Sequence, residues 1–195
     1  MRVSVAASTL TLALAVLGGC DRAEYRTIGV DSMRSGWAGR ERPSEIKPAA
    51  QQEFLRTAAE AGLFEIEASR IAIARGGSAA VRRFAEATLR DRVSIDTDLQ
   101  QLAESVNVAL PSQVGDTLRA RLAVLASLTG NDFDRAYARN VGIIAQEEAL
   151  LAFERAANQE GERVERFAAS QLPGLRKHLE WARQLAAELD RTSMA

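Results

Sequence analysis

From Pro48 almost to the C-terminus, apolar residues recur at alternating intervals of three and four. This spacing keeps side chains on one face of an α-helix, so it indicates amphipathic helices throughout this part of the chain. The pattern predicts an all-α protein with helices over about residues 49–75, 79–106, 115–128, 133–159 and 162–190.

Residues that end or begin helices lie between these segments. Gly76-Gly77 fits the C-terminus of the first helix, and Ser78 fits the N-cap of the second. The last helix contains Pro173, which should kink or break it locally. The remaining boundaries are predicted at Pro111, at Thr129-Gly130-Asn131 with Asp132 as a cap, and at Gly161.

A short internal repeat indicates how the helices are organised. The pattern V-x-R-F-A-x-x-x-L occurs at residues 81–89 and again at 164–172. In both places it opens the second helix of a long helical hairpin. Two such hairpins, joined by a crossover that carries a short helix, predict a ferritin-like four-helix bundle over residues 48–191.

The first 47 residues have a different character. Residues 1–19 combine Arg2 with an apolar run and two small residues, which is typical of an export signal and too short for a membrane span. The run Leu17-Gly18-Gly19-Cys20 resembles a bacterial lipobox, which implies cleavage before Cys20 and lipid attachment to its thiol. The alternative is an ordinary signal peptide followed by a coincidental cysteine. Residues 20–47, rich in Gly, Ser and charge, are then predicted to be a flexible tether.

This N-terminus predicts an exported, periplasmic protein that is lipid-anchored to the inner or the outer membrane. The formal net charge is only −1, so the attachment would come from lipid rather than from a basic patch, and no nucleic-acid partner is expected. Because Cys20 is the only cysteine, the chain forms neither an intrachain disulfide nor a thiolate metal site.

On each long helix, the stripe of apolar residues that is expected to face inward carries one polar residue near its middle. These residues are Glu65, Arg92, Gln146 and His178. The midpoints of antiparallel helices of similar length lie at similar depth, so the four side chains are expected to meet in one buried polar layer. Ferritin-like di-metal proteins place their ligands in the corresponding layer, including a Glu-x-x-His motif on two helices.

The residues of this layer do not favour a metal. Leu175, rather than a glutamate, stands three residues before His178, and Arg92 brings a permanent positive charge that would repel a cation. The leading interpretation is a buried Arg92–Glu65 pair with Gln146 and His178 as hydrogen-bond partners, and no cofactor. Three alternatives stay open: pairing of Arg92 with Asp91 or Glu147 at the flanks, a metal site of Glu65, Glu147 and His178, and a wrong register in which Arg92 reaches solvent.

No catalytic constellation is evident. A Ser-His-Asp arrangement would have to use His178, the only histidine, which the register buries. Ser170 is the nearest serine upstream and lies eight residues away on the same helix. Gly76-Gly77 fits a helix end rather than a phosphate-binding loop. We therefore expect a protein that is not an enzyme.

Several runs together resemble the exported bacterial family labelled domain of unknown function four-one-four-two. They cover about residues 50–190 and are F-L-x-x-A-A-E-A-G-L-F-E-I from Phe54, V-R-R-F-A-E-A-T-L-R-D from Val81, F-D-R-A-Y from Phe133, A-L-L-A-F-E from Ala149 and L-P-G-L-R-K-H-L from Leu172. The resemblance implies a ferritin-like helical fold and export. Family members commonly carry Asp-His at Asp91-Arg92 and a histidine at Gln146, so this chain retains only His178 of three histidine positions.

These observations predict a non-catalytic, lipid-anchored helical bundle of the cell envelope. It would act through contacts with an envelope protein or in an envelope stress response. The alternative is a metal-binding or redox-active ferritin-like protein whose site has degenerated.

Overall fold

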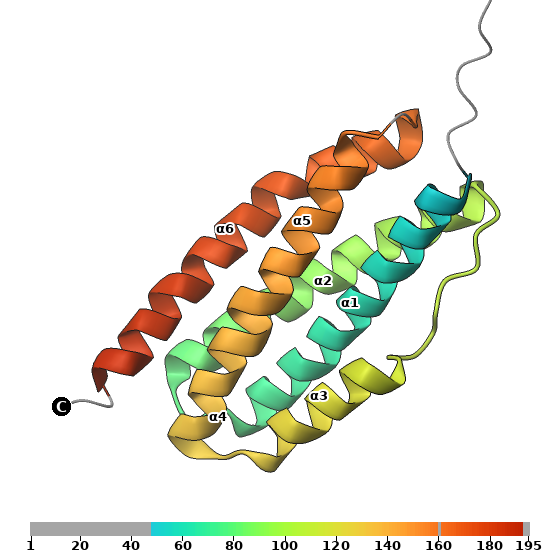
Figure 1. Ribbon diagram of the computed structural model, residues 1–195. Helices are drawn as coiled ribbons and strands as arrows, with labels where there is room; N and C mark the ends of the chain where they lie inside the picture. The colour runs from blue at the N-terminus through green and yellow to red at the C-terminus, as the bar shows by residue number, and fades with distance from the viewer. Residues whose placement is uncertain (1–47, 160, 193–195) are drawn as a thin grey trace, which may run out of the picture. The chain divides into compact units, whose positions relative to one another are not determined.

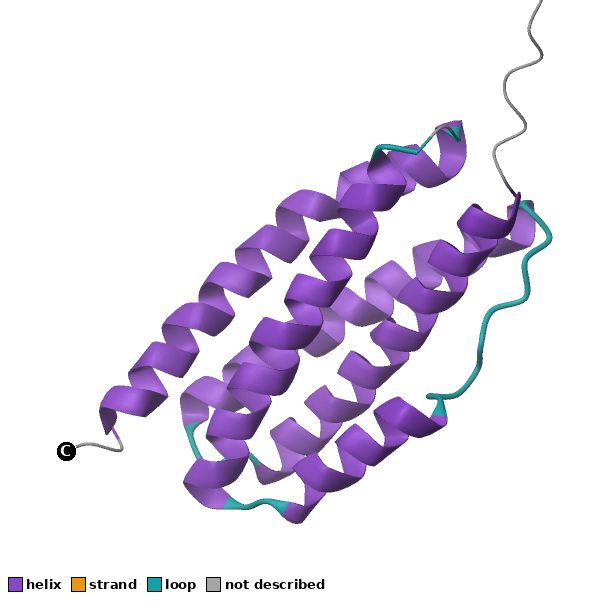
Figure 2. Ribbon diagram, viewed as in Figure 1, coloured by secondary structure: helices purple, strands orange, loops and turns teal. Residues whose placement is uncertain are grey.

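The computed structural model describes residues 48–159 and 161–192. The chain divides into a unit of residues 1–41 and a unit of residues 42–195, and the described residues belong to the second. All secondary structure formed by these residues is helical (Figure 2). The predicted signal peptide (1–19), the predicted tether (20–47) and Cys20 lie outside the described residues.

The helices begin and end within three residues of the predicted positions. Their bounds are α1 (Pro48–Arg75), α2 (Ala79–Ser105), α3 (Asp116–Ser127), α4 (Gly130–Tyr137), the π-helix η2 (Ala138–Ala145), α5 (Gln146–Ala157) and α6 (Glu162–Thr192). None of the described helices is long and apolar enough to cross a membrane.

Two long hairpins form the bundle (Figure 1). One consists of α1 and α2, and the other of the α4–η2–α5 rod and α6. The connection after α2 runs back along the bundle and carries α3, which packs on α1, so α5 runs in the same direction as α2 (Figure 1). The hairpins meet through two seams, α2 against α6 and α1 against α5. The predicted all-α bundle of two hairpins is confirmed.

The turn between α1 and α2 forms as the sequence predicts. The Oγ atom of Ser78 accepts a hydrogen bond from the backbone N–H of Val81 at 3.1 Å, which satisfies one of the free donors at the start of α2.

The predicted cap at Asp132 is wrong. Thr129 occupies the cap position with an extended backbone, and Gly130 adopts a φ of 55°, which a glycine tolerates without strain. The helix therefore begins two residues earlier than Asp132. The carboxylate of Asp132 lies in the first turn and pairs with Arg135 at 2.5 Å.

The sequence predicts a kink or a break at Pro173, and the break does not occur, because α6 continues through this residue. A proline inside a helix leaves the carbonyl four residues earlier without its usual partner, here that of Ala169. Both residues are exposed, so water can satisfy this carbonyl.

The sequence pattern did not reveal the π-helix within the predicted fourth helix. Eight residues, Ala138–Ala145, form η2 between α4 and α5. Gly142 in this segment is buried, and a Cβ atom placed on it would lie 2.9 Å from the Cβ atom of Ala182 and 3.3 Å from Cε1 of Phe84. The glycine therefore permits close packing of η2 against α6 and α2. Such π-segments occur frequently at functional sites.

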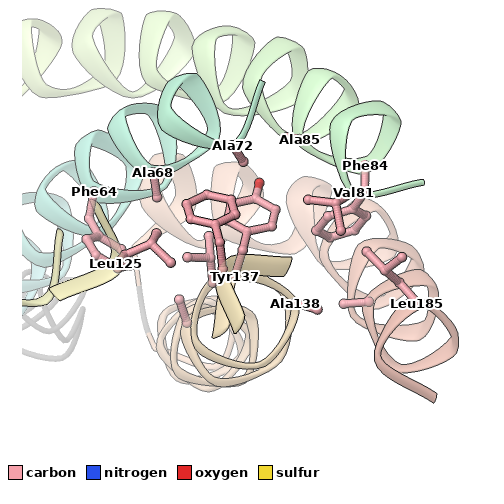
Figure 3. Packing of buried hydrophobic residues seen from close by; sticks show 14 of the residues in the cluster. Phe64, Ala68, Ala72, Val81, Phe84, Ala85, Leu125, Tyr137, Ala138 and Leu185 are labelled. Carbon is pink, nitrogen blue, oxygen red and sulfur yellow. The ribbon is translucent and has the colours of Figure 1, made fainter. Parts of the chain in front are cut away.

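The apolar core consists of two clusters rather than one. The Tyr137 cluster, part of which is shown in Figure 3, includes Phe64, Ala68, Ala72, Phe84, Phe133, Val141, Ala182 and Leu185. The Phe153 cluster includes Phe54, Leu55, Ala58, Leu99, Ala149, Val164, Ala168 and Leu175. On three of the four long helical rods (α2, α4–η2–α5 and α6), the polar residue predicted at mid-depth lies between these two groups in the sequence. On α1, Phe64 of the Tyr137 cluster directly precedes Glu65.

Candidate functional site

The four predicted polar residues are all buried. Glu65 is 0% exposed, Gln146 1%, Arg92 5% and His178 9%. They come from α1, α5, α2 and α6, one from each of the four long rods. The three-and-four spacing thus identified which residues of each helix face the interior.

Three of these residues form a closed hydrogen-bonded triangle, which we call the Arg92 triad. Nε of Arg92 donates to Oε2 of Glu65 at 2.8 Å, and its Nη2 donates to Oε1 of Gln146 at 2.8 Å. The Nε2 atom of Gln146 in turn donates to Oε2 of Glu65 at 2.8 Å. The predicted Arg92–Glu65 pair is therefore present, and Arg92 does not extend to solvent. Each member supports the other two, which is how a buried ion pair avoids most of its desolvation cost.

His178 does not bond to the triad, contrary to the prediction. Its Nε2 atom lies 2.6 Å from Oδ2 of Asp91, whose side chain is 58% exposed. Successive residues of a helix point about 100° apart. Asp91, directly before Arg92, therefore faces α6 while Arg92 faces the centre of the bundle. The Nδ1 atom of His178 is buried without a hydrogen-bond partner among the described residues.

The alternative metal set of Glu65, Glu147 and His178 is not brought together. Glu147 follows Gln146 on α5 and points away from the layer, where its Oε1 atom accepts from Nη2 of Arg183 at 2.8 Å. Within residues 48–159 and 161–192, no group of three His, Cys, Asp or Glu side chains is placed to hold a metal ion. Neither Asp91 nor Glu147 pairs with Arg92, which corrects the two flanking alternatives.

Sequence reasoning missed two further buried contacts beside the layer. The hydroxyl groups of Ser69 and Tyr137 are hydrogen-bonded at 2.9 Å. The Asp134 carboxylate accepts from the backbone N–H of Gly77 at 2.8 Å and of Ser78 at 2.7 Å, and so fastens α4 to the turn between α1 and α2. Asp134 and Tyr137 both lie in the run F-D-R-A-Y, but only the fold shows what they contact.

Burial dominates the electrostatics of the layer. It raises the pKa of Glu65 above its ordinary value of 4.5, and the adjacent Arg92 guanidinium opposes this rise. Burial also raises the pKa of the Tyr137 hydroxyl, so this group stays neutral.

The raised pKa of Glu65 predicts a specific pH dependence of stability. Above pH 4.5 the unfolded chain releases the proton of this carboxyl while the folded chain still holds it, so stability falls as the pH rises through this range. Comparing urea unfolding of the protein and of Glu65→Gln between pH 4 and pH 8 measures the effect. We expect the variant to lose less stability than the parent over this interval. Equal or steeper loss in the variant would contradict the raised pKa.

Two pockets lie on either side of the layer. The α2–α6 pocket, of about 170 Å³, is lined by Asp91, Arg92 and His178 among others. The α1–α5 pocket, of about 150 Å³, is lined by Glu65 and Arg92 together with residues of α3 and η2. Arg92 lines both, so each pocket lies at one of the two seams between the hairpins and the Arg92 side chain lies between them.

Comparison with known proteins gives a family but no characterised relative. A family model described as "Domain of unknown function (DUF4142)" matches residues 39–185. Neither a search of curated proteins nor a search of solved structures found a match. The ferritin-like assignment of the bundle therefore stays a prediction. The matched region covers well over half of the chain and all of the triad, and the protein belongs to this family of unknown function.

Proposed function

We propose that the protein is a non-catalytic, lipid-anchored component of the bacterial cell envelope that acts through contacts with another envelope protein or in a stress response. The non-catalytic part of this proposal rests on one observation, the closed Arg92 triad. The most buried carboxylate of the interior, Glu65, is engaged by a guanidinium and an amide instead of facing a substrate.

The triad also supports a structural role rather than a redox role for the layer. A cation bound at Glu65 would lie beside the fixed positive charge of Arg92, and would have to displace the bonds that Arg92 Nε and Gln146 Nε2 make to Oε2. The other strong donor, His178, is turned toward Asp91.

Metal analysis tests the non-catalytic proposal. Protein purified without a histidine tag should contain no stoichiometric transition metal by mass spectrometry. Glu65→Ala and His178→Ala serve as matched variants. A stoichiometric metal in the parent that either variant loses would overturn the structural role of the layer.

Cys20 provides the test of anchoring. We expect the protein to incorporate an alkyne-labelled fatty acid in bacterial cells and to fractionate with membranes. The Cys20→Ser variant should lose the label and appear in the soluble periplasmic fraction, because the thiol is the acceptor of the lipid. An unlabelled protein, or a Cys20→Ser variant that keeps the label, would contradict the lipid anchor.

A further inference from the structure

A third cavity lies away from the polar layer, beside the connection between α2 and α3. We call it the crossover groove. It has a volume of about 510 Å³ and is lined by Leu63 of α1, by the C-terminal half of α2 and by residues 108–112 of the connection. The two pockets at the layer are smaller, at about 170 and 150 Å³. Sites for small organic ligands typically measure about 300–1,000 Å³, so the crossover groove has the size of such a site.

Apolar side chains from all three elements line the crossover groove. Leu63 comes from α1, Ala103 from α2, and Val108, Leu110 and Pro111 from the connection. Ala103 is buried, and the other four are half-buried. An aliphatic chain lying against these residues would remove apolar surface from water, which favours binding.

The charged residues that line the groove are both acidic. They are Asp96 and Glu104, and no lysine, arginine or histidine lines it. Oδ2 of Asp96 accepts a hydrogen bond from Nε2 of Gln100 at 2.7 Å, which is a neutral donor. Within residues 48–159 and 161–192, neither carboxylate forms an ion pair. The groove therefore complements a positively charged ligand.

The spacing of the two carboxylates indicates the length of this ligand. Asp96 and Glu104 both belong to α2, and Gln100, which also lines the groove, lies midway between them. With a rise of 1.5 Å per residue, their Cα atoms are about 12 Å apart along the helix axis. One small cation cannot contact both carboxylates over this distance, whereas a longer molecule with a positive charge at each end can.

We infer that the crossover groove binds a linear alkyldiammonium ion, in which an aliphatic chain joins two ammonium groups. One ammonium group donates N–H hydrogen bonds to Asp96 and the other to Glu104. The aliphatic chain between them covers the apolar residues of the groove. Two contacts that are weak separately gain affinity when one molecule makes both. This ligand class goes beyond the proposed envelope role and does not depend on it.

Octamethylenediamine is the probe, because its extended chain has about the length that separates the two carboxylates. It is titrated against the full-length protein by calorimetry at pH 7 and constant ionic strength. Octylamine has the same chain with one ammonium group, tetramethylenediamine has two ammonium groups too close together, and suberate carries the opposite charges. We expect octamethylenediamine to bind about tenfold or more tightly than each of these compounds. It should also raise the melting temperature, since it binds the folded protein.

A fourth compound tests the apolar part of the groove. It is the diamine of the same length in which two methylene groups are replaced by ether oxygens. This compound keeps both charges and their spacing but buries less apolar surface, so it should bind more weakly than octamethylenediamine.

Three variants locate the site. Asp96→Asn and Glu104→Gln each remove one charge without changing the shape of the side chain. Each should weaken octamethylenediamine binding about tenfold and bring it close to that of octylamine, because only one ion pair remains. Asp98→Asn is the matched control, since Asp98 is an exposed residue of α2 that does not line the groove, and this variant should bind as the parent does. Circular dichroism checks that all three variants fold.

Several results would overturn the inference. Octamethylenediamine could fail to bind the parent protein, or octylamine, tetramethylenediamine or suberate could bind as tightly. Unchanged affinity in both Asp96→Asn and Glu104→Gln, or an equal loss in Asp98→Asn, would show that the charges of the groove are not the binding determinants. The comparison of compounds uses the parent protein alone, so it decides the question even if a variant does not fold.

Discussion

Replacing Arg92 with alanine is expected to lower the free energy of unfolding by about 3 kcal/mol. The substitution leaves Glu65 fully buried with only Gln146 as a partner, and Oε1 of Gln146 loses its donor. Most of this loss comes from burying the Glu65 carboxyl group without its cationic partner. The removed side chain also opens space between the two pockets. Urea unfolding followed by circular dichroism at pH 7 measures the change.

A surface pair provides the matched control. Arg176 contacts Glu154 at 2.9 Å, but the two side chains are 58% and 40% exposed, so Arg176→Ala should cost less than about 1 kcal/mol. The double variant Glu65→Gln/Arg92→Ala should recover part of the loss, because it no longer buries an unpaired carboxyl group. A loss below about 0.5 kcal/mol for Arg92→Ala would show that the guanidinium is not part of a buried pair.

Asp134→Ala is expected to cost about 3 kcal/mol, by a different mechanism. Its carboxylate is 1% exposed and accepts from the backbone N–H groups of Gly77 and Ser78. Removing it leaves two backbone donors at the α1–α2 turn without their partner, and hydrogen bonds to charged groups are among the stronger ones in proteins. Thermal and urea unfolding of the variant measure the loss.

Asp132, two residues earlier on the same helix, is the control for this effect. Its side chain is 74% exposed and pairs with Arg135 within the helix. Asp132→Ala should therefore change stability by less than about 0.5 kcal/mol. Similar losses for the two variants would mean that Asp134 contributes only a surface charge and not a tie between α4 and the turn.

The helices and the buried layer could be predicted because both follow from one periodicity. A residue that continues the three-and-four spacing must face the same side as its apolar neighbours, whatever its own chemistry. This reasoning placed Glu65, Arg92, Gln146 and His178 inside, and it paired Arg92 with Glu65 correctly. It depends on each helix separately and needs no knowledge of the loops.

The partner of His178 could not be predicted in the same way. Whether it contacts Gln146 or Asp91 depends on the rotation of α6 against α2 and on a side-chain rotamer. Neither of these can be deduced from the spacing of apolar residues. Asp91 is mostly exposed and lies off the inward stripe, so the register gave no reason to consider it for His178.

The π-helix and the Asp134 contact show a second limit. A π-helix is wider than an α-helix, and this geometry depends on packing, here on the close approach of Gly142 to Ala182. The apolar spacing in η2 does not differ from that expected of an α-helix. In the predicted helix, which starts at about residue 133, Asp134 falls in the first turn, where a solvent-exposed carboxylate is common. Its burial follows from where the turn between α1 and α2 lies, which only the tertiary structure determines.

The division of the core by the Arg92 triad also limits how the helices can slide. Apolar stripes of alanine and leucine would still interlock reasonably well if α2 moved along its axis by one turn, about 5.4 Å. Such a shift would carry the guanidinium of Arg92 into one of the apolar clusters and break the hydrogen bonds that it donates to Glu65 and Gln146. The Arg92 triad at mid-depth thus defines one alignment of α1, α2 and α5 among several that hydrophobic packing alone would accept.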